Sequence, residues 1–306
     1  MIGIYDADNT GFPNLALMKI SAYYKSNNIP VEWANPLFGK YAKVYISKVF
    51  SFSKSPNYIF NAGDIIYGGT GYNYNTLPQE IDKMQPDYSI YPYIDNKTAY
   101  GFLTRGCPNK CKWCIVPHKE GKIKPYMDIE EIATDGRRNI ILMDNNILAS
   151  NYGLEQLNKI IKLCLYVDFN QGLDARLVTD DIAQILARVN FIKYIRFGCD
   201  TEQQIIECEN AIAKIDKYKS KSSNYFLYTM LNDDIKECCK RINYFRRNRN
   251  VTIFAQPFLK PGCKNRFEVP QWQKDLARYC NIKSIYRTIE LPDYQPRLNV
   301  RFKDYL

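Results

Sequence analysis

The feature that most constrains the fold is a strand–loop–helix pattern that repeats six times between residues 99 and 256. The expected strands are 99–104, 140–143, 166–170, 194–197, 225–230 and 252–256. Helical patterns lie at 129–135, 152–164, 180–189, 202–216 and 233–247, with Asp128, Thr179, Thr201 and Asn232 as expected N-caps. Such units need parallel strands joined by crossovers, in an open sheet or in a full or partial barrel. Ligands are then expected at the C-terminal ends of the strands.

The first hundred residues predict a separate α/β unit. Strand-like runs lie at 1–6, 31–33, 43–50 and 64–67, and a helix is expected to begin after Pro13-Asn14. Residues 79–97 contain prolines and several tyrosines and are predicted to be a linker. A chain of 306 residues is long enough for two domains. We predict domains at 1–95 and 96–262, followed by an extension at 263–306 that packs on the second domain.

Three cysteines lie within eight residues directly after the first of the six strands. Cys107, Cys111 and Cys114 have the spacing Cys-x3-Cys-x2-Cys, in a chain with ten cysteines and no secretory signal. In a reducing compartment, such a group indicates a metal site rather than disulfide bonds. Three thiolates can hold three irons of a cubane cluster and leave the fourth iron without a protein ligand. A Cys3His zinc site that includes His118 is the alternative.

The run from Gly106 to Pro117, with Trp113 directly before the third cysteine, resembles the radical S-adenosylmethionine (SAM) enzymes. Within that superfamily it is most similar to the cobalamin-domain and methylthiotransferase branches. The resemblance implies a Rossmann-like (cobalamin-binding-like) N-terminal domain followed by a partial (β/α)6 TIM-type barrel. It also implies a 4Fe–4S cluster on Cys107, Cys111 and Cys114, with SAM on the open iron. A flavodoxin- or ferredoxin-type electron donor would then drive SAM cleavage to a 5′-deoxyadenosyl radical that attacks the substrate.

Polar residues at the strand ends are the expected SAM contacts. Under the resemblance, Asp144 and Asn145 would bind the SAM amino group, and Trp113 would lie against the adenine. The remaining candidates at the ends of the third and fourth strands are Gln171, Asp174, Arg176, Arg196 and Asp200. Arg176 is expected to clamp the SAM carboxylate. The alternatives are that Asp174 and Arg176 pair with each other or cap the next helix, and that Trp113 is a core aromatic.

The N-terminal unit departs from both branches. No histidine precedes His118, so the cobalt-binding histidine motif is missing and an empty or repurposed domain is expected instead of a cobalamin site. Residues 1–106 contain no cysteine, whereas methylthiotransferases carry further cysteines there for a second cluster. A second cluster on Cys238, Cys239, Cys263 and Cys280 would match no ferredoxin-like spacing. The missing cysteines in residues 1–106 put methylthiolation in doubt.

The net charge of +10 belongs entirely to residues 101–306. Six basic residues face one acidic residue between Arg105 and Lys124, and a second basic run comprises Lys236, Lys240, Arg241, Arg246, Arg247 and Arg249. These runs indicate either an anionic partner, tRNA or DNA, or a solvated helix face. The alternative substrates are a peptide or a small metabolite, and the alternative class is a non-enzymatic zinc-dependent nucleic-acid-binding protein. With no apolar run of membrane-spanning length and no signal-peptide pattern, a soluble, cytoplasmic protein is expected.

Overall fold

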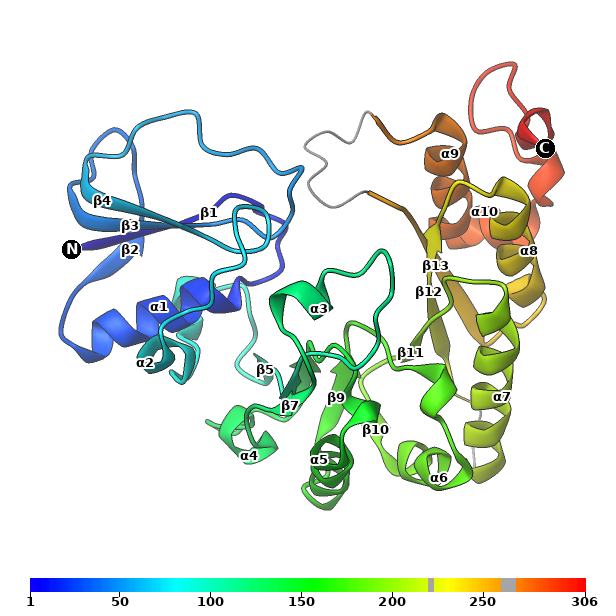
Figure 1. Cartoon of the computed structure of the whole chain (residues 1–306), viewed down its shortest axis with the longest axis horizontal. Coiled ribbons are helices and arrows are strands. Elements are labelled where there is room, and N and C mark those ends of the chain that lie inside the picture. The colour runs from blue at the N-terminus through cyan, green and yellow to red at the C-terminus, as the bar shows by residue number, and fades with distance from the viewer. Residues whose placement is uncertain (220–222, 260–267) are drawn as a thin grey trace. The chain divides into compact units, whose positions relative to one another are not determined.

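The structure is a computed structural model that describes residues 1–219, 223–259 and 268–306 (Figure 1). The described chain forms two compact units, residues 1–100 and residues 101–259 with 268–306. Both units combine helices with parallel strands, which confirms the predicted α/β class. The predicted boundary between residues 262 and 263 lies outside the described residues.

The first unit is built on a parallel sheet with strand order β2-β1-β3-β4. Its strands are β1 (Ile2–Asp6), β2 (Val31–Trp33), β3 (Tyr41–Ser47) and β4 (Ala62–Gly68). Helix α1 (Leu15–Ser26) begins at Asn14, whose side chain accepts a hydrogen bond from the Leu17 amide. This cap satisfies one of the free N–H groups of the first turn. Ile4 and Met18 are buried in the core between the sheet and α1.

The connections that follow β2 and β3 contain loops instead of helices. Residues 34–40 and 48–61 have no helical segment. The second loop is held by side chains: the Asp8 carboxylate accepts a hydrogen bond from the Phe50 amide, and the buried Lys48 ammonium donates to Ser55 at 3.2 Å. The unit therefore has parallel strands but fewer covering helices than a doubly wound fold.

The predicted linker at 79–97 is wrong for most of its length. It contains α2 (Gln79–Asp82) and a 3-10 turn, η1 (Tyr88–Ile90). Ile81, Ile90 and Tyr91 are buried in the core against α1. The prolines and tyrosines predict an exposed segment. The segment is instead part of the first unit, because burying these three apolar side chains stabilises it against the core although little of it is helix or strand.

The second unit contains two larger sheets, with strand orders β10-β9-β8-β5 and β11-β12-β13. The strands of the first are β5 (Thr98–Gly101), which runs across the boundary between residues 100 and 101, β8 (Asn139–Leu142), β9 (Tyr166–Phe169) and β10 (Asn190–Phe191). The second comprises β11 (Ile195–Gly198), β12 (Tyr225–Leu231) and β13 (Val251–Pro257). A parallel bridge between Leu173 and Phe197 links the two sheets directly beyond β9. The six predicted strands are present, and β10 is an additional short strand.

Helices of the second unit follow the predicted alternation from α4 onward, and α5, α6, α7 and α8 lie in an outer arc around its strands (Figure 1). They are α3 (Val116–Lys119), α4 (Ile129–Ile132), α5 (Asn151–Lys162), α6 (Asp180–Arg188), α7 (Gln203–Tyr218) and α8 (Ile235–Arg246). Short 3-10 turns lie at η2 (Ile147–Ala149) and η3 (Ala175–Leu177). Asp128 and Thr179 are N-caps as predicted, whereas Glu202 and Asp234 occupy the positions expected for Thr201 and Asn232.

The C-terminal segment covers the edge of β13. It forms α9 (Gln271–Asn281), α10 (Lys283–Thr288) and the turns η5 (Leu291–Asp293) and η6 (Phe302–Tyr305). The Asn281 side chain accepts a hydrogen bond from the Ala255 amide at 2.8 Å and donates to the Ala255 carbonyl at 2.9 Å. One amide side chain thus satisfies both backbone groups of an edge residue, as a neighbouring strand would.

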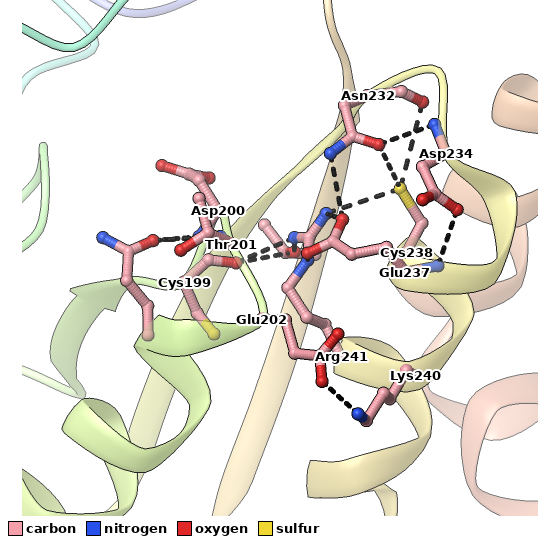
Figure 2. Close-up of polar contacts among 12 residues, drawn as sticks. Cys199, Asp200, Thr201, Glu202, Asn232, Asp234, Glu237, Cys238, Lys240 and Arg241 are labelled. Carbon is pink, nitrogen blue, oxygen red and sulfur yellow. Dashed lines mark hydrogen bonds and ion pairs between the residues drawn. The ribbon is translucent and has the colours of Figure 1, made fainter.

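Arg241 fastens α8 to the C-terminal ends of β11 and β12 (Figure 2). Its side chain is 1% exposed and donates to the Cys199 and Met230 carbonyl oxygens, each at 2.9 Å. Glu237, one turn earlier, accepts from the guanidinium at 2.7 Å and balances its charge. The sequence predicts that Arg241 belongs to a basic run that faces an anionic partner or solvent. The side chain is instead buried, and its guanidinium donates to the Cys199 and Met230 carbonyl oxygens and to the Glu237 carboxylate.

Replacing Arg241 with methionine is expected to lower the free energy of unfolding by about 3–5 kcal/mol, because Glu237 and the strand-end carbonyls lose their donor. Lys240, next to it on α8, pairs with Glu202 at the surface, and Lys240→Met is expected to cost less than about 1 kcal/mol. Urea unfolding followed by circular dichroism measures both. Equal losses for the two variants would contradict the assigned role of Arg241.

Candidate functional site

The cysteine motif lies in a loop that is closed at its base by a short antiparallel ladder. β6 (Thr104–Arg105) pairs with β7 (Lys124–Pro125) at the two ends of this loop. Gly106 begins the loop with a φ of +86°, and a Cβ atom there would lie 2.4 Å from the Lys122 carbonyl oxygen. Only glycine permits both this backbone conformation and this approach. The backbone segments that enter and leave the loop are therefore in direct contact at Gly106 and Lys122.

Arg105 adds a side-chain clamp to the same base. Its guanidinium donates to the Glu120 carboxylate, with Nε 2.7 Å from Oε2, and lies 4.0 Å above the centre of the Phe102 ring. The sequence predicts that Arg105 is one of the positive charges that face an anionic partner. In the structure, the Glu120 carboxylate pairs with the Arg105 guanidinium and neutralises its charge. The exposed positive charge of the loop comes instead from lysines, namely Lys110, Lys112, Lys122 and Lys124.

The three thiols of the loop are half-buried and free of disulfide bonds. Burial raises the pKa of Cys111, although the nearby Arg176 charge acts in the opposite direction, and burial also raises the pKa of Cys114. Cys107 receives hydrogen bonds at sulfur from the Asn109 amide at 3.4 Å and from Nδ2 of Asn146 at 3.7 Å. Metal binding would release protons from these thiols, as it does from cysteine ligands generally.

Asp174 joins the loop to the end of the third strand. Its Oδ2 accepts from Nδ2 of Asn109 at 3.0 Å and from Nδ2 of Asn146 at 3.1 Å. Arg176 donates to both carboxylate oxygens at 2.7 Å, and Asp174 also caps η3. Burial opposes ionisation, but the Arg176 guanidinium and the two amides outweigh it and lower the pKa of Asp174. The alternative that Asp174 and Arg176 pair with each other is therefore observed, and Arg176 remains exposed beside Cys111.

Asp144 anchors the base of the loop from the end of β8. Its buried carboxylate accepts hydrogen bonds from the Leu103 amide at 3.1 Å and the Thr104 hydroxyl at 2.7 Å. Burial raises the pKa of Asp144 to about 6, while these hydrogen bonds act in the opposite direction. Asn145 accepts from the Gly106 amide at 3.2 Å. Both residues predicted to bind an ammonium group therefore hold the backbone at the start of the cysteine loop.

Asp200 is the other predicted residue whose charge acts on the thiols. It follows β11, and its carboxylate contributes to the raised pKa of both Cys111 and Cys114. Burial raises the pKa of Asp200 itself, although the Met230 amide donates to its Oδ1 at 2.8 Å. The Arg241 guanidinium donates to the carbonyl oxygen of Cys199, the residue before Asp200 (Figure 2). This hydrogen bond therefore helps to fix the position of Asp200.

The remaining residues predicted to contact SAM are Arg196, Gln171 and Trp113. Arg196 forms a two-point ion pair with Asp168 of β9, at 2.5 and 2.7 Å, and also donates to the Tyr228 hydroxyl at 3.3 Å. It thereby connects the strands β9 and β11 of the two sheets. Gln171 is exposed, and Trp113 is half-buried between the second and third cysteines.

Sequence reasoning missed Asn109 and Asn146, the two residues whose hydrogen bonds reach the Cys107 sulfur. Asn146 directly follows the predicted pair Asp144-Asn145, so the prediction identified this strand end but did not include Asn146. The residue is 3% exposed, and its Oδ1 has no hydrogen-bond partner within the described chain. A buried acceptor without a donor is costly, so it fits a group that binds beside Cys107 and brings an N–H.

Three thiols in one loop, with N–H donors at the Cys107 sulfur, form a donor set that fits an iron–sulfur cluster. Across residues 1–219, 223–259 and 268–306, no three His, Cys, Asp or Glu side chains converge on one point that would hold a metal ion. His118 is exposed on α3. A cubane cluster instead binds each thiolate at a separate iron, and N–H donors to the sulfurs are a common feature of such sites.

Among the described residues, Cys238, Cys239 and Cys280 belong to no group of side chains that could hold a metal ion. Cys238, Cys239 and Cys280 are buried. Burial raises the pKa of Cys238 to about 11 and that of Cys239 to about 12, so both thiols are protonated. Cys263, the fourth cysteine considered for a second cluster, lies outside the described residues. The three described cysteines behave as small apolar core residues.

Comparison with known proteins identifies relatives of one kind. No protein-family model matches the chain. The chain is 26% identical over 199 residues to a tRNA-2-methylthio-N(6)-dimethylallyladenosine synthase of Fusobacterium nucleatum, covering 52% of this chain and 45% of that protein. It is 34% identical over 143 residues to the synthase of Helicobacter pylori, covering 41% and 29%, and 28% identical over 128 residues to that of Aquifex aeolicus, covering 37% and 28%. The matches thus span less than half the length of these relatives.

These relatives are methylthiotransferases of the radical SAM superfamily, which confirms the resemblance drawn from the cysteine motif. No helix in the described part of the chain is both long enough and apolar enough to cross a bilayer.

Replacing Asp144 with alanine is expected to lower the free energy of unfolding by about 3 kcal/mol, because the Leu103 amide and both Thr104 donors lose a buried acceptor. Asp233→Ala, which removes an exposed carboxylate, is the matched control and is expected to change stability by less than about 0.5 kcal/mol. Guanidinium unfolding curves of both variants provide the measurement. An Asp144→Ala variant as stable as the control would rule out the anchoring role.

Proposed function

We propose that this chain, which resembles the radical SAM enzymes, holds a 4Fe–4S cluster on Cys107, Cys111 and Cys114 and uses it to modify tRNA. The observation that supports the proposal is that three free thiols lie in one anchored loop, whose Asn109 donates a hydrogen bond to Asp174, a residue that follows the parallel strand β9. The C-terminal ends of such strands are where ligands bind in parallel α/β folds. The relatives named above support the same chemistry.

The cluster and SAM, when bound, would supply one-electron cleavage of SAM to methionine and a 5′-deoxyadenosyl radical. The protein itself would hold the cluster and SAM in place and shield them from solvent. Asp144 and Asn145 fix the start of the loop, and Arg105 with Glu120 closes its base. Arg176, which is exposed and already pairs with Asp174, carries a positive charge that acts on Cys111 and would attract a further carboxylate group. The unpartnered Asn146 Oδ1 is an acceptor for an ammonium donor.

The fold proposed for this function has two parts. The six strands β5, β8, β9, β11, β12 and β13 would form a partial (β/α)6 barrel, with the Leu173–Phe197 bridge as the point where the two sheets join. Residues 1–100 would be a Rossmann-like domain without cobalamin. A flavodoxin- or ferredoxin-type protein is proposed as the electron donor.

A tRNA substrate is supported by the relatives and by the charge of the loop. Lys110, Lys112, Lys122 and Lys124 are exposed around the thiols. The second basic run contributes less, because Lys240, Arg241 and Arg246 are each engaged in an ion pair. The absence of cysteine from residues 1–106 leads us to propose a reaction that draws no sulfur from a second cluster in the N-terminal unit.

Cys111→Ala is expected to abolish cluster assembly and formation of 5′-deoxyadenosine, because two thiolates do not replace three. The exposed Cys164, outside the loop, gives the matched control Cys164→Ala, which is expected to retain both. Anaerobic reconstitution, iron and sulfide analysis, and chromatography of the nucleoside product provide the readouts. Nucleoside formation by Cys111→Ala would refute the site, and a colourless wild-type protein that binds zinc would favour the non-enzymatic alternative.

Replacing Lys110, Lys112, Lys122 and Lys124 together with alanine is expected to weaken tRNA binding and to flatten its salt dependence. Each lost phosphate contact reduces the slope of log K against log salt by about 0.7–0.9. Lys236→Ala with Arg247→Ala on α8 and directly after it is the control and should leave the slope near that of the wild type. Binding measured by filter retention at several salt concentrations tests this. An unchanged slope in the quadruple variant would favour a peptide or small-molecule substrate.

A further inference from the structure

We infer that Asn146 is a positioning residue that favours the reduced cluster by donating a hydrogen bond to the Cys107 sulfur. The inference rests on the proposed function, since it requires the cluster in the cysteine loop. It concerns a residue that neither the sequence motif nor the similarity to known proteins singles out. The observations that carry it are the contacts of one buried amide group.

The Asn146 side-chain nitrogen has two hydrogens, and the structure provides an acceptor for each. One acceptor is the Cys107 sulfur at 3.7 Å, and the other is Oδ2 of Asp174 at 3.1 Å. The residue lies between β8 and η2, is 3% exposed, and is held there by the buried Ile147 and Leu148 that follow it. Water does not compete for this donor, because the side chain is almost completely buried.

Asp174 determines which end of the amide faces the sulfur. If the amide were reversed, Oδ1 of Asn146 would face the carboxylate, and two acceptors would lie together. The Asp174 carboxylate is kept ionised by Arg176, which donates to both of its oxygens. The ion pair between Asp174 and Arg176 therefore fixes the orientation of the amide, and the amide places an N–H on Cys107.

A hydrogen bond to a cluster thiolate stabilises the more negative oxidation state. Reduction adds one electron to the cluster, and part of that charge is shared with the cysteine sulfurs, so an N–H donor raises the reduction potential. Cys107 has two such donors, the Asn109 backbone amide and the Asn146 side chain. This placement makes the cluster easier to reduce by the small electron-transfer protein that the proposed function requires.

The test compares two asparagines whose side chains both donate a hydrogen bond to Asp174. The Asn146 side chain also donates to the Cys107 sulfur, whereas Asn109 donates to that sulfur through its backbone amide. Asn146→Leu keeps the shape of the side chain and removes its donor to Cys107. Asn109→Ala removes an amide bound to Asp174, but its sulfur donor is the backbone N–H, which remains. Midpoint potentials come from redox titrations of the reconstituted proteins followed by electron paramagnetic resonance.

Asn146→Leu is expected to lower the equilibrium constant for cluster reduction by up to about tenfold, which is about 59 mV for a one-electron couple. Asn109→Ala is expected to titrate with the wild type. An unchanged potential in Asn146→Leu, or an equal shift in both variants, would overturn the inference while a cluster in the wild type still supports the proposed function. A wild-type protein that takes up no iron–sulfur cluster would instead overturn the proposed function.

A second measurement covers the case in which Asn146→Leu does not assemble a cluster. Wild-type protein containing asparagine labelled with ¹⁵N only at the side-chain nitrogen is reduced and examined by electron–nuclear double resonance. A ¹⁵N coupling to the cluster is expected, because the Asn146 amide contacts a ligand sulfur. The absence of this coupling in protein with a reduced cluster would overturn the inference.

Discussion

The buried carboxylate of Asp144 holds the cysteine loop to the strand ends, and the rest of the site depends on this contact. It accepts hydrogen bonds from the Leu103 amide and from Thr104, directly before the loop. Without them, the chain between β5 and the cysteines would have buried donors and no fixed direction. With the loop anchored there, side chains that follow β8 and β9 bind it: Asn146 donates to the Cys107 sulfur, and Asp174 accepts from Asn109. Asp200, after β11, adds a negative charge that acts on Cys111 and Cys114.

The sequence predicted six strands and five helices between residues 98 and 257 to within a few residues, because apolar periodicity and N-caps are local signals. It failed where the deciding contact is distant in the chain. Arg105 and Arg241 belong to basic runs, yet one pairs with Glu120 and the other is buried under strand-end carbonyls. In the same way, the sequence did not predict the role of Asn146, whose partners Cys107 and Asp174 are both distant in the chain. A side chain's partner depends on tertiary position, which the local pattern does not contain.

The relatives and the structure limit the proposed function in complementary ways. The relatives are named as tRNA-modifying synthases, and the part of them that matches covers less than half of their length. The first unit of this chain has a parallel sheet with few helices and, by sequence, no cysteine or histidine. The chemistry proposed here is therefore confined to the second unit, where the thiols, the exposed lysines and the polar strand ends lie together.

The central claim is that three thiolates hold a four-iron cluster and leave one iron open. Mössbauer spectra of ⁵⁷Fe-reconstituted, oxygen-free protein, recorded before and after addition of SAM, test this most directly. The expected result is a cluster of about four irons in which one iron alone changes its signal when SAM is added. A spectrum without cluster iron, or one that SAM leaves unchanged, would contradict the claim.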